Sequence, residues 1–212
     1  MSIRESYDRW AELYDTNENR TRDLEAVALR ETLQEVPFSG CLEIGCGTGK
    51  NTEWLMTRTS HVTAVDFSEG MLEKARKKIR HPEVEFIRAD IREPWTFARR
   101  SYGMITFSLV LEHVEDLGEI FRKASSALAD NGYIYVGELH PARQYGGTKA
   151  RFETHQGTET LTCFTHHLSD FTGAAGAVGL NVVAIHEYFD NDDRNGIPRI
   201  LGLLFQKIRP IE

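Results

Sequence analysis

The glycines between Gly45 and Gly49 place the strongest constraint on how this chain can fold. The segment reads Cys41-Leu42-Glu43-Ile44-Gly45-Cys46-Gly47-Thr48-Gly49, and a helix-compatible stretch follows from Lys50 to Met56. The four residues before Gly45 are typical of a buried parallel strand. A strand, a tight glycine turn and a helix form a nucleotide-binding element, because glycine lets a ligand approach the bare backbone and the helix start offers unpaired N–H groups.

A second predicted strand strengthens this interpretation. Residues Val62 to Val65 are apolar or β-branched, and Asp66 ends the strand about twenty residues after Gly45, the spacing at which an acid binds a ribose diol in such folds. Glu43 stands two residues before Gly45. Because the glycine spacing is Gly-x-Gly-x-Gly and an acid lies beside it, the turn suits an ammonium or sulfonium better than a diphosphate.

Strand and helix patterns alternate along the rest of the chain. Further strands are predicted at 84–87, 102–107, 133–139, 181–189 and 199–207, with Asn195-Gly196 as a turn between antiparallel neighbours. This alternation predicts an α/β, Rossmann-like, doubly wound sheet of seven strands, mostly parallel with an antiparallel last strand. The length of 212 residues suits a single domain over 1–212.

Three helices between these strands have clear signals. The first carries Leu24, Val27, Ala28 and Leu33 inward and ends before Pro37. The second is capped by Ser68 and buries Met71, Leu72, Ala75 and Ile79, with basic residues on its outer face. The third is capped by Asp116, has an apolar stripe that runs to Leu128, and closes at Asn131-Gly132.

Two segments lie outside the alternation. Tyr7, Trp10, Ala11 and Tyr14 share one face of a short helix that Ser6 could cap, which fits either core packing or a lid over a ligand. The polar run 15–22 favours the lid, so residues 1–36 are expected to form an N-terminal helical lid. Residues 140–167 lack periodicity, and we expect this insertion to form the acceptor pocket. Within it, Arg143, Tyr145, Arg151 and His155 could bind a carboxylate or hydroxyl, or could be ordinary surface.

Composition excludes several classes of protein. The net charge is −7 and the pI is about 5.7, which argues against binding nucleic acid or an anionic membrane surface. There is no signal-peptide pattern and no run of eighteen apolar residues, so a cytoplasmic protein is expected. Cys41, Cys46 and Cys163 match no zinc or redox spacing and are expected to be reduced thiols. The oligomeric state, monomer or homodimer, is left open.

No metal site is expected. The candidate ligands are His166 and His167, together with His155. Adjacent histidines such as His166 and His167 would point to opposite sides of a strand, and no carboxylate stands at ligand spacing. The acidic run 190–193 has its glycine misplaced for a calcium loop and lacks the closing glutamate, so it is interpreted as a solvated turn.

The ordered motifs resemble those of the class I S-adenosylmethionine (SAM)-dependent methyltransferases. The chain is similar to the type 11 group, which includes ubiquinone and menaquinone biosynthesis enzymes. The motifs that carry the resemblance are Tyr7-Asp8-x-Trp10-Ala11-x-x-Tyr14-Asp15, Leu42 to Gly49, Val65-Asp66-Phe67-Ser68, Ala89-Asp90-Ile91 and Ser108 to Val114. They cover most of the chain and imply the fold and the cofactor much more specifically than the acceptor.

The resemblance implies a role for each motif. Residues implied at the methionine end of SAM are Tyr14, Glu43, Gly45, Cys46, Gly47, Ser108 and Leu109, with Glu43 near the ammonium and Tyr14 closing over it. Residues implied at the adenosine end are Asp66, Phe67, Met71, Asp90 and Ile91. There, Asp66 would accept from both ribose hydroxyls, Phe67 and Met71 would pack on adenine, and Asp90 would accept from the adenine amino group.

The implied reaction is in-line methyl transfer from SAM to an acceptor atom, leaving S-adenosylhomocysteine (SAH). Alignment would supply much of the catalysis, and His113 and His140 are candidates for a general base because they follow strands at the ligand edge. Alternatively, His113 hydrogen-bonds beneath the cofactor and His140-Pro141 shapes a turn.

The expected acceptor is an O, N or C atom of a small-molecule metabolite. Methylation of RNA, DNA or protein is an alternative, disfavoured by the acidic charge and by Ser108-Leu109-Val110-Leu111 standing where amino-methylating nucleic-acid enzymes carry Asn/Asp-Pro-Pro-Tyr. An NAD(P)-dependent oxidoreductase and a non-catalytic cofactor-binding subunit are alternatives from other classes.

Overall fold

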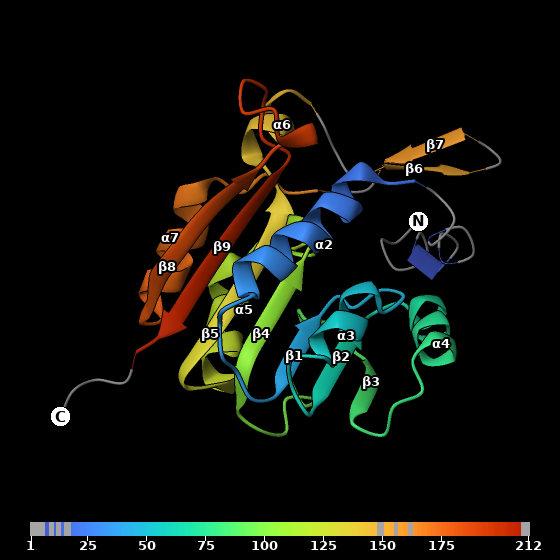
Figure 1. Cartoon of the computed structure of the whole chain (residues 1–212), viewed down its shortest axis with the longest axis vertical. Coiled ribbons are helices and arrows are strands. Elements are labelled where there is room, and N and C mark those ends of the chain that lie inside the picture. The colour runs from blue at the N-terminus through green and yellow to red at the C-terminus, as the bar shows by residue number, and fades with distance from the viewer. Residues whose placement is uncertain are drawn as a thin grey trace.

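The computed structural model describes residues 7–8, 11, 14, 18–147, 151–154, 157–160 and 163–208, with the backbone alone at 151–154 and 157–160. The proposed cap Ser6, Trp10 and His155 lie outside these residues, as does the 15–17 part of the polar run. Element labels follow Figure 1.

A seven-stranded twisted sheet forms the centre of the molecule (Figure 1). The strand order is β3 (Val84–Arg88), β2 (Val62–Asp66), β1 (Cys41–Ile44), β4 (Tyr102–Ser108), β5 (Leu128–Leu139), β9 (Ile200–Lys207) and β8 (Leu180–Tyr188). Neighbouring strands from β3 to β5 pair in parallel, whereas β9 is antiparallel to both β5 and β8. The predicted mostly parallel sheet with an antiparallel last strand is therefore confirmed.

Helices cover both faces of the sheet. On one face lie α2 (Arg20–Leu33), α3 (Lys50–Leu55) and α4 (Glu69–Lys78), and on the other lie α5 (Leu117–Ala127) and α7 (Leu168–Ala177) (Figure 1). Each face has its own apolar core. The α5 and α7 side contains Phe107, Phe121 and Phe205, and the α2 side contains Leu29 and Tyr135. Burial of these large side chains from water holds the layers together.

The helix starts are fixed by the caps that the sequence predicts. The Ser68 hydroxyl accepts a hydrogen bond from the Met71 N–H at 3.2 Å, and Asp116 Oδ1 accepts one from the Glu119 N–H at 3.1 Å. Each cap pairs an N–H that the helix itself leaves unpaired. The cap at Ser68 matters for the site, because it begins α4 directly after the strand that ends in Asp66.

The buried face of α2 differs from the predicted one. Ala28 and Leu33 are buried as expected, but Val27 is 42% exposed, while Glu25 is only 2% exposed. The apolar periodicity therefore predicted a buried face of α2 that is off by about one position. The Glu25 carboxyl is buried because it hydrogen-bonds Asn51 and Tyr135. An acid consequently lies inside the molecule on a helix that patterning treats as simply amphipathic.

Strand β5 also begins earlier than predicted. The helix α5 ends at Ala127, and Leu128 pairs with Tyr102 in the sheet instead of extending the helical stripe. Asn131 adopts the left-handed conformation (φ 59°) within an irregularity of β5. The prediction that Leu128 belongs to the helix was wrong, because a leucine in either element buries the same apolar face.

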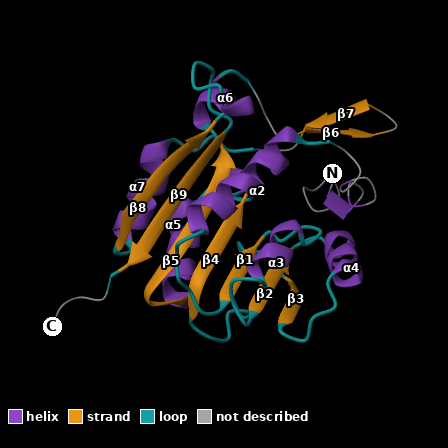
Figure 2. Ribbon diagram, in the orientation of Figure 1, coloured by secondary structure: helices purple, strands orange, loops and turns teal. Residues whose placement is uncertain are grey.

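The segment predicted to be irregular contains short regular elements. A helix α6 (Pro141–Tyr145) follows β5, and a hairpin of β6 (Arg151–Thr154) and β7 (Gly157–Thr160) follows α6. Figure 2 shows α6 and the hairpin at the end of the sheet to which β4 and β5 point. Two 3₁₀ turns, η1 (Leu111–His113) and η2 (Asp190–Asp192), complete the described elements.

The acidic run at η2 is more than a solvated turn. Asp190 accepts hydrogen bonds from Arg143 at 2.7 Å and from two nitrogens of Arg199. These ion pairs join α6 to the start of β9, and they engage Arg143 within the protein. The interpretation of the run as a solvated turn was therefore incomplete, because its first residue is a structural anchor.

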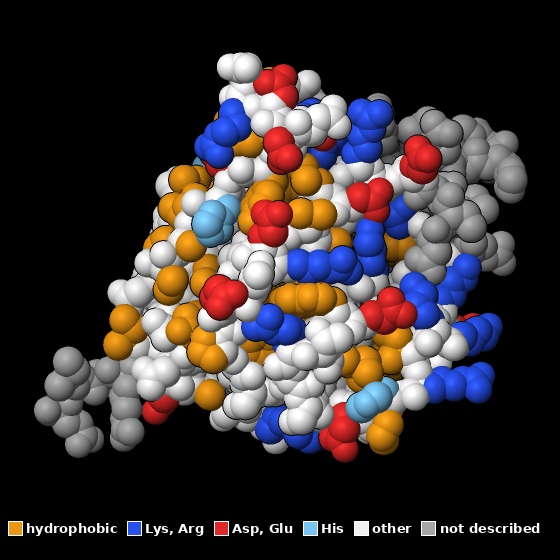
Figure 3. Space-filling view, viewed as in Figure 1, with side chains coloured by type: hydrophobic (Ala, Val, Ile, Leu, Met, Phe, Trp, Pro, Cys, Tyr) orange, Lys and Arg blue, Asp and Glu red, His pale blue; other side chains and the backbone are white. Residues whose placement is uncertain are grey.

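The surface mixes both charge signs over the face that α2 covers, and basic side chains gather at the edge formed by α4 (Figure 3). Arg76, Lys77 and Arg80 are exposed there, as the sequence predicts. None of the helices in the described ranges has the length and apolar character needed to cross a bilayer.

Candidate active site

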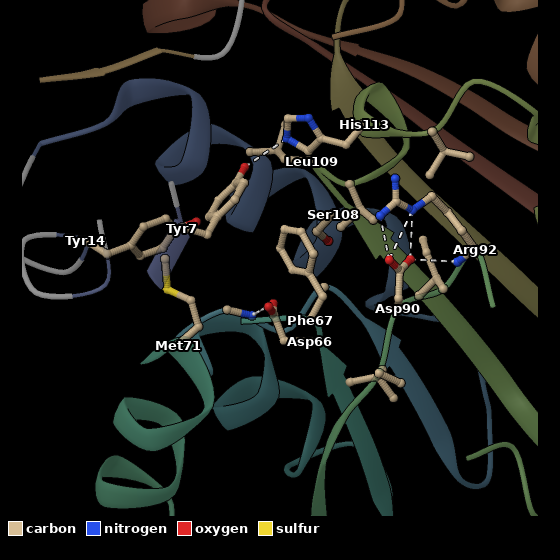
Figure 4. A pocket seen from close by; sticks show the side chains of 17 residues that line it. Tyr7, Tyr14, Asp66, Phe67, Met71, Asp90, Arg92, Ser108, Leu109 and His113 are labelled. Atoms are coloured by element: carbon tan, nitrogen blue, oxygen red, sulfur yellow. Dashed lines mark hydrogen bonds and ion pairs between the residues drawn. The ribbon is translucent and has the colours of Figure 1, made fainter. Parts of the chain in front are cut away.

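An open pocket lies at the carboxyl ends of β1, β2 and β4. In an open α/β sheet, ligands bind at this edge. Of the residues expected at a cofactor site, the pocket brings together Tyr14, Gly45, Gly47, Asp66, Phe67, Met71, Asp90, Ile91, Ser108 and Leu109, and it includes the candidate base His113 (Figure 4). Residues from both halves of the sheet thus converge on one cavity.

The glycine turn leaves space that no other residue would leave. Gly45 has φ +74°, and a Cβ on it would lie 2.0 Å from Cγ2 of Val110, another pocket residue. Gly47 has φ +52°, and a Cβ there would lie 3.9 Å from the Tyr14 ring. Glycine is required at Gly45 both for its backbone angle and for the close approach of the opposite wall.

Asp66 ties the glycine turn to the start of α4. Its Oδ2 accepts from the Gly47 N–H at 2.9 Å, and its Oδ1 accepts from the Ser68 N–H at 2.9 Å. Burial raises the pKa of Asp66 to about 6, although the backbone hydrogen bonds act in the opposite direction. The carboxyl therefore reaches the pocket already oriented by backbone donors on two elements.

An apolar wall and an ion pair face each other across the pocket (Figure 4). Phe67 and Met71 supply flat apolar surface, and the ring of Tyr7 meets Phe67 edge-on at 5.6 Å. Across from them, Arg92 binds Asp90 through bonds of 2.6 to 3.2 Å and holds the pKa of that carboxyl below its usual range. The expected adenine-binding acid is thus shared with an arginine.

The turn after β4 is held from below by Glu138. Leu109 lines the pocket with the left-handed φ of 56°, a conformation that is costly for a leucine. Glu138 Oε1 accepts from the N–H groups of Val110 and Leu111 at 2.8 and 2.7 Å. These two bonds fix the turn that presents Leu109 and Val110 to the pocket. Burial raises the pKa of Glu138, and nearby Glu112 raises it further.

Contacts of Tyr7, Asp8 and Tyr14 hold the N-terminal segment, here Tyr7, Asp8, Ala11 and Tyr14, against the pocket. Asp8 Oδ1 accepts from the Ser68 hydroxyl and from the Gly70 N–H. Tyr7 OH lies 2.9 Å from His113 Nε2. The guanidinium of Arg22 stacks 3.9 Å from the Tyr14 ring centroid and donates to the Tyr14 carbonyl oxygen at 2.6 Å. Both tyrosines consequently line the pocket from outside the sheet.

Three expected site residues do not line the pocket. Glu43 is buried beneath it, accepts from the Thr52 hydroxyl, and has its pKa raised to about 8 by burial. Cys46 is buried within the turn. His140 caps α6, accepting from the Ala142 N–H at 3.2 Å with its Nδ1, while its Nε2 lies 3.2 Å from Glu187. The structure therefore does not bring His140 together with His113.

Sequence reasoning gave no role at the site to Glu25, Arg92, Val110 or Glu138. Arg92 had a signal, since it follows Asp90 by two residues, but surface arginines are common. The others had none, because their partners lie far away in sequence, as with Val110 opposite Gly45. Tyr7 was recognised in a motif but not as a partner of His113.

The residues fit a nucleoside joined to an amino acid. The pocket offers a glycine turn without side chains, a buried acid at the end of β2 and an apolar wall for a base. Asp66 lies in its wall and Glu25 and Glu43 lie behind it, and burial raises the pKa of all three carboxyls. A positively charged ligand would favour their ionised forms. Among the described residues, no cluster of three or more histidine, cysteine or acidic side chains could hold a metal ion.

Comparisons with known proteins agree with this geometry. Residues 42–136 match the family model described as a methyltransferase domain. The chain is 29% identical over 139 residues to the biotin biosynthesis bifunctional protein BioHC of Cellvibrio japonicus. The aligned residues cover 66% of this chain and 27% of that protein. The chain is 32% identical over 95 residues to a malonyl-[acyl-carrier protein] O-methyltransferase of Acetivibrio thermocellus, covering 44% of this chain and 33% of that protein.

Solved structures extend the similarity over the whole fold. The DhpI–SAH complex superposes with a TM-score of 0.76 at 23% identity, covering 98% of this chain and 95% of that one. The sheet order, the glycine turn and the matched domain support a class I SAM-dependent methyltransferase. The matched residues 42–136 make up less than half of the chain of 212 residues. The chain spans about a quarter to a third of the two curated relatives named above.

Proposed function

We propose that this protein binds SAM in the pocket and transfers its methyl group to an O, N or C atom of a small-molecule metabolite. The observation that carries the proposal is the convergence of the glycine turn, Asp66 and Asp90 on one pocket. The matched methyltransferase domain supports it. The names of relatives, which include a malonyl-[acyl-carrier protein] O-methyltransferase and a trans-aconitate 2-methyltransferase, favour acceptors that carry a carboxyl group.

Each residue role follows from its position. Gly45, Gly47, Ser108 and Leu109 would hold the amino-acid end of the cofactor, and Asp66 the ribose. Phe67, Met71, Ile91 and Asp90 would hold adenine, with Arg92 fixing Asp90. Bound SAM supplies a methyl group already activated by its sulfonium charge, so the protein's task is to align an acceptor and exclude water.

Proton handling falls to Tyr7 and His113. Burial raises the pKa of Tyr7 well above its usual value, so its hydroxyl stays protonated, 2.9 Å from His113 Nε2. An acceptor that loses a proton would deliver it to His113 Nε2 directly or through the Tyr7 hydroxyl. His140 has no part in this step, because its Nδ1 accepts from the Ala142 N–H and its Nε2 lies at the Glu187 carboxylate.

The N-terminal lid and the insertion at 140–167 are proposed to enclose the acceptor. Support comes from Tyr7 and Tyr14 in the pocket wall and from α6 at the same end of the sheet (Figure 2). The single-domain organisation over 1–212 and a cytoplasmic location belong to the same proposal. The buried, unpaired thiols of Cys41 and Cys46 are consistent with a reducing compartment.

Isothermal titration calorimetry tests the cofactor assignment. SAM, SAH and NADH are titrated into the wild type and into Asp66→Ala. Micromolar binding of the two sulfur nucleosides, no binding of NADH and loss of binding in Asp66→Ala are expected. Binding of NADH in preference to SAM would replace the proposal with an oxidoreductase. Tight SAM binding without turnover on a panel of carboxylic, phenolic and amine acceptors would favour a non-catalytic subunit.

A further inference from the structure

A buried polar cluster lies behind the pocket wall at Ser108. Its members are Glu25 on α2, Asn51 on α3, Ser108 at the end of β4 and Tyr135 on β5. Glu25 is 2% exposed and Asn51 is 8% exposed, whereas Ser108 also lines the pocket. The cluster is thus closed to solvent on the α2 side and meets the pocket through Ser108.

The hydrogen bonds converge on the Glu25 carboxyl. Asn51 Nδ2 donates to Glu25 Oε2 at 3.0 Å and approaches Ser108 Oγ at 3.3 Å. The Tyr135 hydroxyl donates to Glu25 Oε1 at 3.3 Å, and Ser108 also hydrogen-bonds the carboxyl. The carboxyl group therefore holds the amide of Asn51 and the hydroxyl of Ser108 in place.

The fold keeps space for this carboxyl. Gly137 pairs with Ser108 between β5 and β4, and a Cβ on Gly137 would lie 2.6 Å from Glu25 Oε1 and 2.5 Å from the Tyr135 hydroxyl. Gly137 has no positive φ, so its backbone does not demand glycine. The absence of a side chain at Gly137 leaves room for the Glu25 carboxyl next to the end of β4, where that strand meets the pocket.

The cluster has more acceptors than donors. Asn51 Oδ1 is buried and accepts no hydrogen bond from the described residues, and no cation of those residues forms an ion pair with Glu25. Lys50, whose charge acts on the Glu25 carboxyl, is itself paired with Asp23, with its Nζ 2.5 Å from Oδ1. A buried acceptor without a partner and a buried acid without a counterion are both costly, and a cationic ligand group would relieve both costs.

We propose that Glu25 is a positioning residue that, through Asn51 and Ser108, receives the ammonium group at the amino-acid end of the cofactor. This inference rests on the proposed function. It assigns to Glu25 the electrostatic role that the sequence had suggested for Glu43, because Glu25 hydrogen-bonds Ser108 in the pocket wall, whereas Glu43 hydrogen-bonds Thr52.

The charge state of Glu25 supports the assignment. Burial raises its pKa to about 7, so near neutral pH a bound cation would draw off a proton. The titratable and charged groups that act on Glu25, or on which it acts, are Lys50, Glu43, Glu138, Tyr14 and Tyr135. Of these, Lys50 alone is cationic.

The test compares two ligands that differ in the amino-acid end. SAH carries the ammonium, whereas 5′-methylthioadenosine has the same nucleoside and thioether without it. Both are titrated by calorimetry into the wild type, Glu25→Gln and Glu31→Gln, the last being an exposed acid on the same helix. Thermal unfolding confirms that each variant is folded.

Glu25→Gln is expected to weaken SAH binding roughly 10- to 100-fold, the range for a lost hydrogen bond to a charged group, and to leave methylthioadenosine within about threefold. Glu31→Gln should change neither. Gly137→Ala, which displaces the carboxyl instead of neutralising it, should show the same selective loss. Repeating the SAH titration in buffers of different ionisation enthalpy should reveal proton release by the wild type near pH 7 and less by Glu25→Gln.

Equal weakening of both ligands, or no weakening of either, in folded Glu25→Gln would overturn the inference about the ammonium. These outcomes are distinct from failure of the proposed function, in which the wild type itself would bind neither SAH nor methylthioadenosine.

Discussion

The hydroxyl of Tyr7 lies 2.9 Å from Nε2 of His113, and this contact joins the N-terminal segment to η1 across the mouth of the pocket (Figure 4). We expect Tyr7→Phe to lower kcat about tenfold or more for an acceptor that must lose a proton, since general acid–base steps contribute about 10² to 10⁴. SAH affinity should stay within about threefold, because the ring that packs on Phe67 remains. Single-turnover kinetics and calorimetry measure the two effects.

Tyr188→Phe is the matched control. Tyr188 OH lies 3.1 Å from Thr32 Oγ1, outside the pocket. The control variant should leave both kcat and SAH affinity unchanged. Equal losses in the two variants would remove the special role of Tyr7.

Gly45→Ala is expected to abolish cofactor binding in the concentration range that saturates the wild type. The added methyl group would meet Val110 Cγ2 at 2.0 Å, and φ of +74° is strained for alanine. Relief of the clash requires the pocket wall to move. Gly40→Ala separates the two causes, since Gly40 has φ +69° but nothing within 4 Å of the added Cβ. It should lose about 1 to 2 kcal/mol of stability from strain and keep SAH affinity. Comparable affinity loss in both would argue against the clash.

The cofactor-free protein should become less stable as pH rises from about 5 to 8. Burial raises the pKa of Asp66 to about 6, of Glu25 and Glu112 to about 7, and of Glu43 to about 8. A carboxyl whose folded pKa is raised gives stability below its unfolded pKa, near 4, and loses it as pH passes the folded pKa. Each titrating group can contribute a slope of at most about 1.4 kcal/mol per pH unit.

Urea unfolding at a series of pH values measures this slope. Glu43→Gln should flatten the curve at its upper end, because it removes the group with the highest of these pKa values. Stability that rises steadily from pH 5 to 8 would contradict the assignment of buried, protonated acids.

Glu138→Ala should destabilise the protein far more than Glu138→Gln. Alanine leaves the buried N–H groups of Val110 and Leu111 without the acceptor they share, at about 1 to 3 kcal/mol each, while glutamine keeps an acceptor oxygen. Folded Glu138→Ala protein should also bind SAH more weakly, because Leu109 lies in the same turn. Chemical denaturation and calorimetry would reveal this ordering, and identical behaviour of the two variants would refute it.

Local sequence patterns predicted the fold well where a pattern fits only one kind of structural element. Ser68 and Asp116 cap helices as their positions before the apolar stripes indicate, and the glycine turn lies where its spacing indicates. Leu128 was assigned to a helix, since burial of a leucine has the same signature in a helix and in a strand. Val27 was predicted to be buried because apolar periodicity does not reveal that an acid, Glu25, lies on the buried face of α2.

The site was predictable only in part, for a related reason. Motif residues such as Asp66 and Ser108 occupy strand ends, which sequence fixes directly. Glu25 contacts Tyr135 across 110 positions and Glu138 contacts Leu111 across 27, and nothing in the local sequence of either acid marks its partner. His140 looked equivalent to His113 because both follow strands, yet β5 leads into α6 and turns His140 toward Glu187.

The helix α2 has a consequence for synthesis on the ribosome. It packs on β9 and β5, and it is linked to the far end of the chain by Thr32 with Tyr188 and by Thr21 with Arg199. These contacts span 156 and 178 positions. At translation rates of about 5 to 20 residues per second, α2 waits roughly 10 to 30 s for β9 to emerge. During that interval the earlier strands, β5 among them, can cover only part of its inward face, and the part that packs on β9 stays exposed. Exposed apolar surface of this kind favours association between nascent chains.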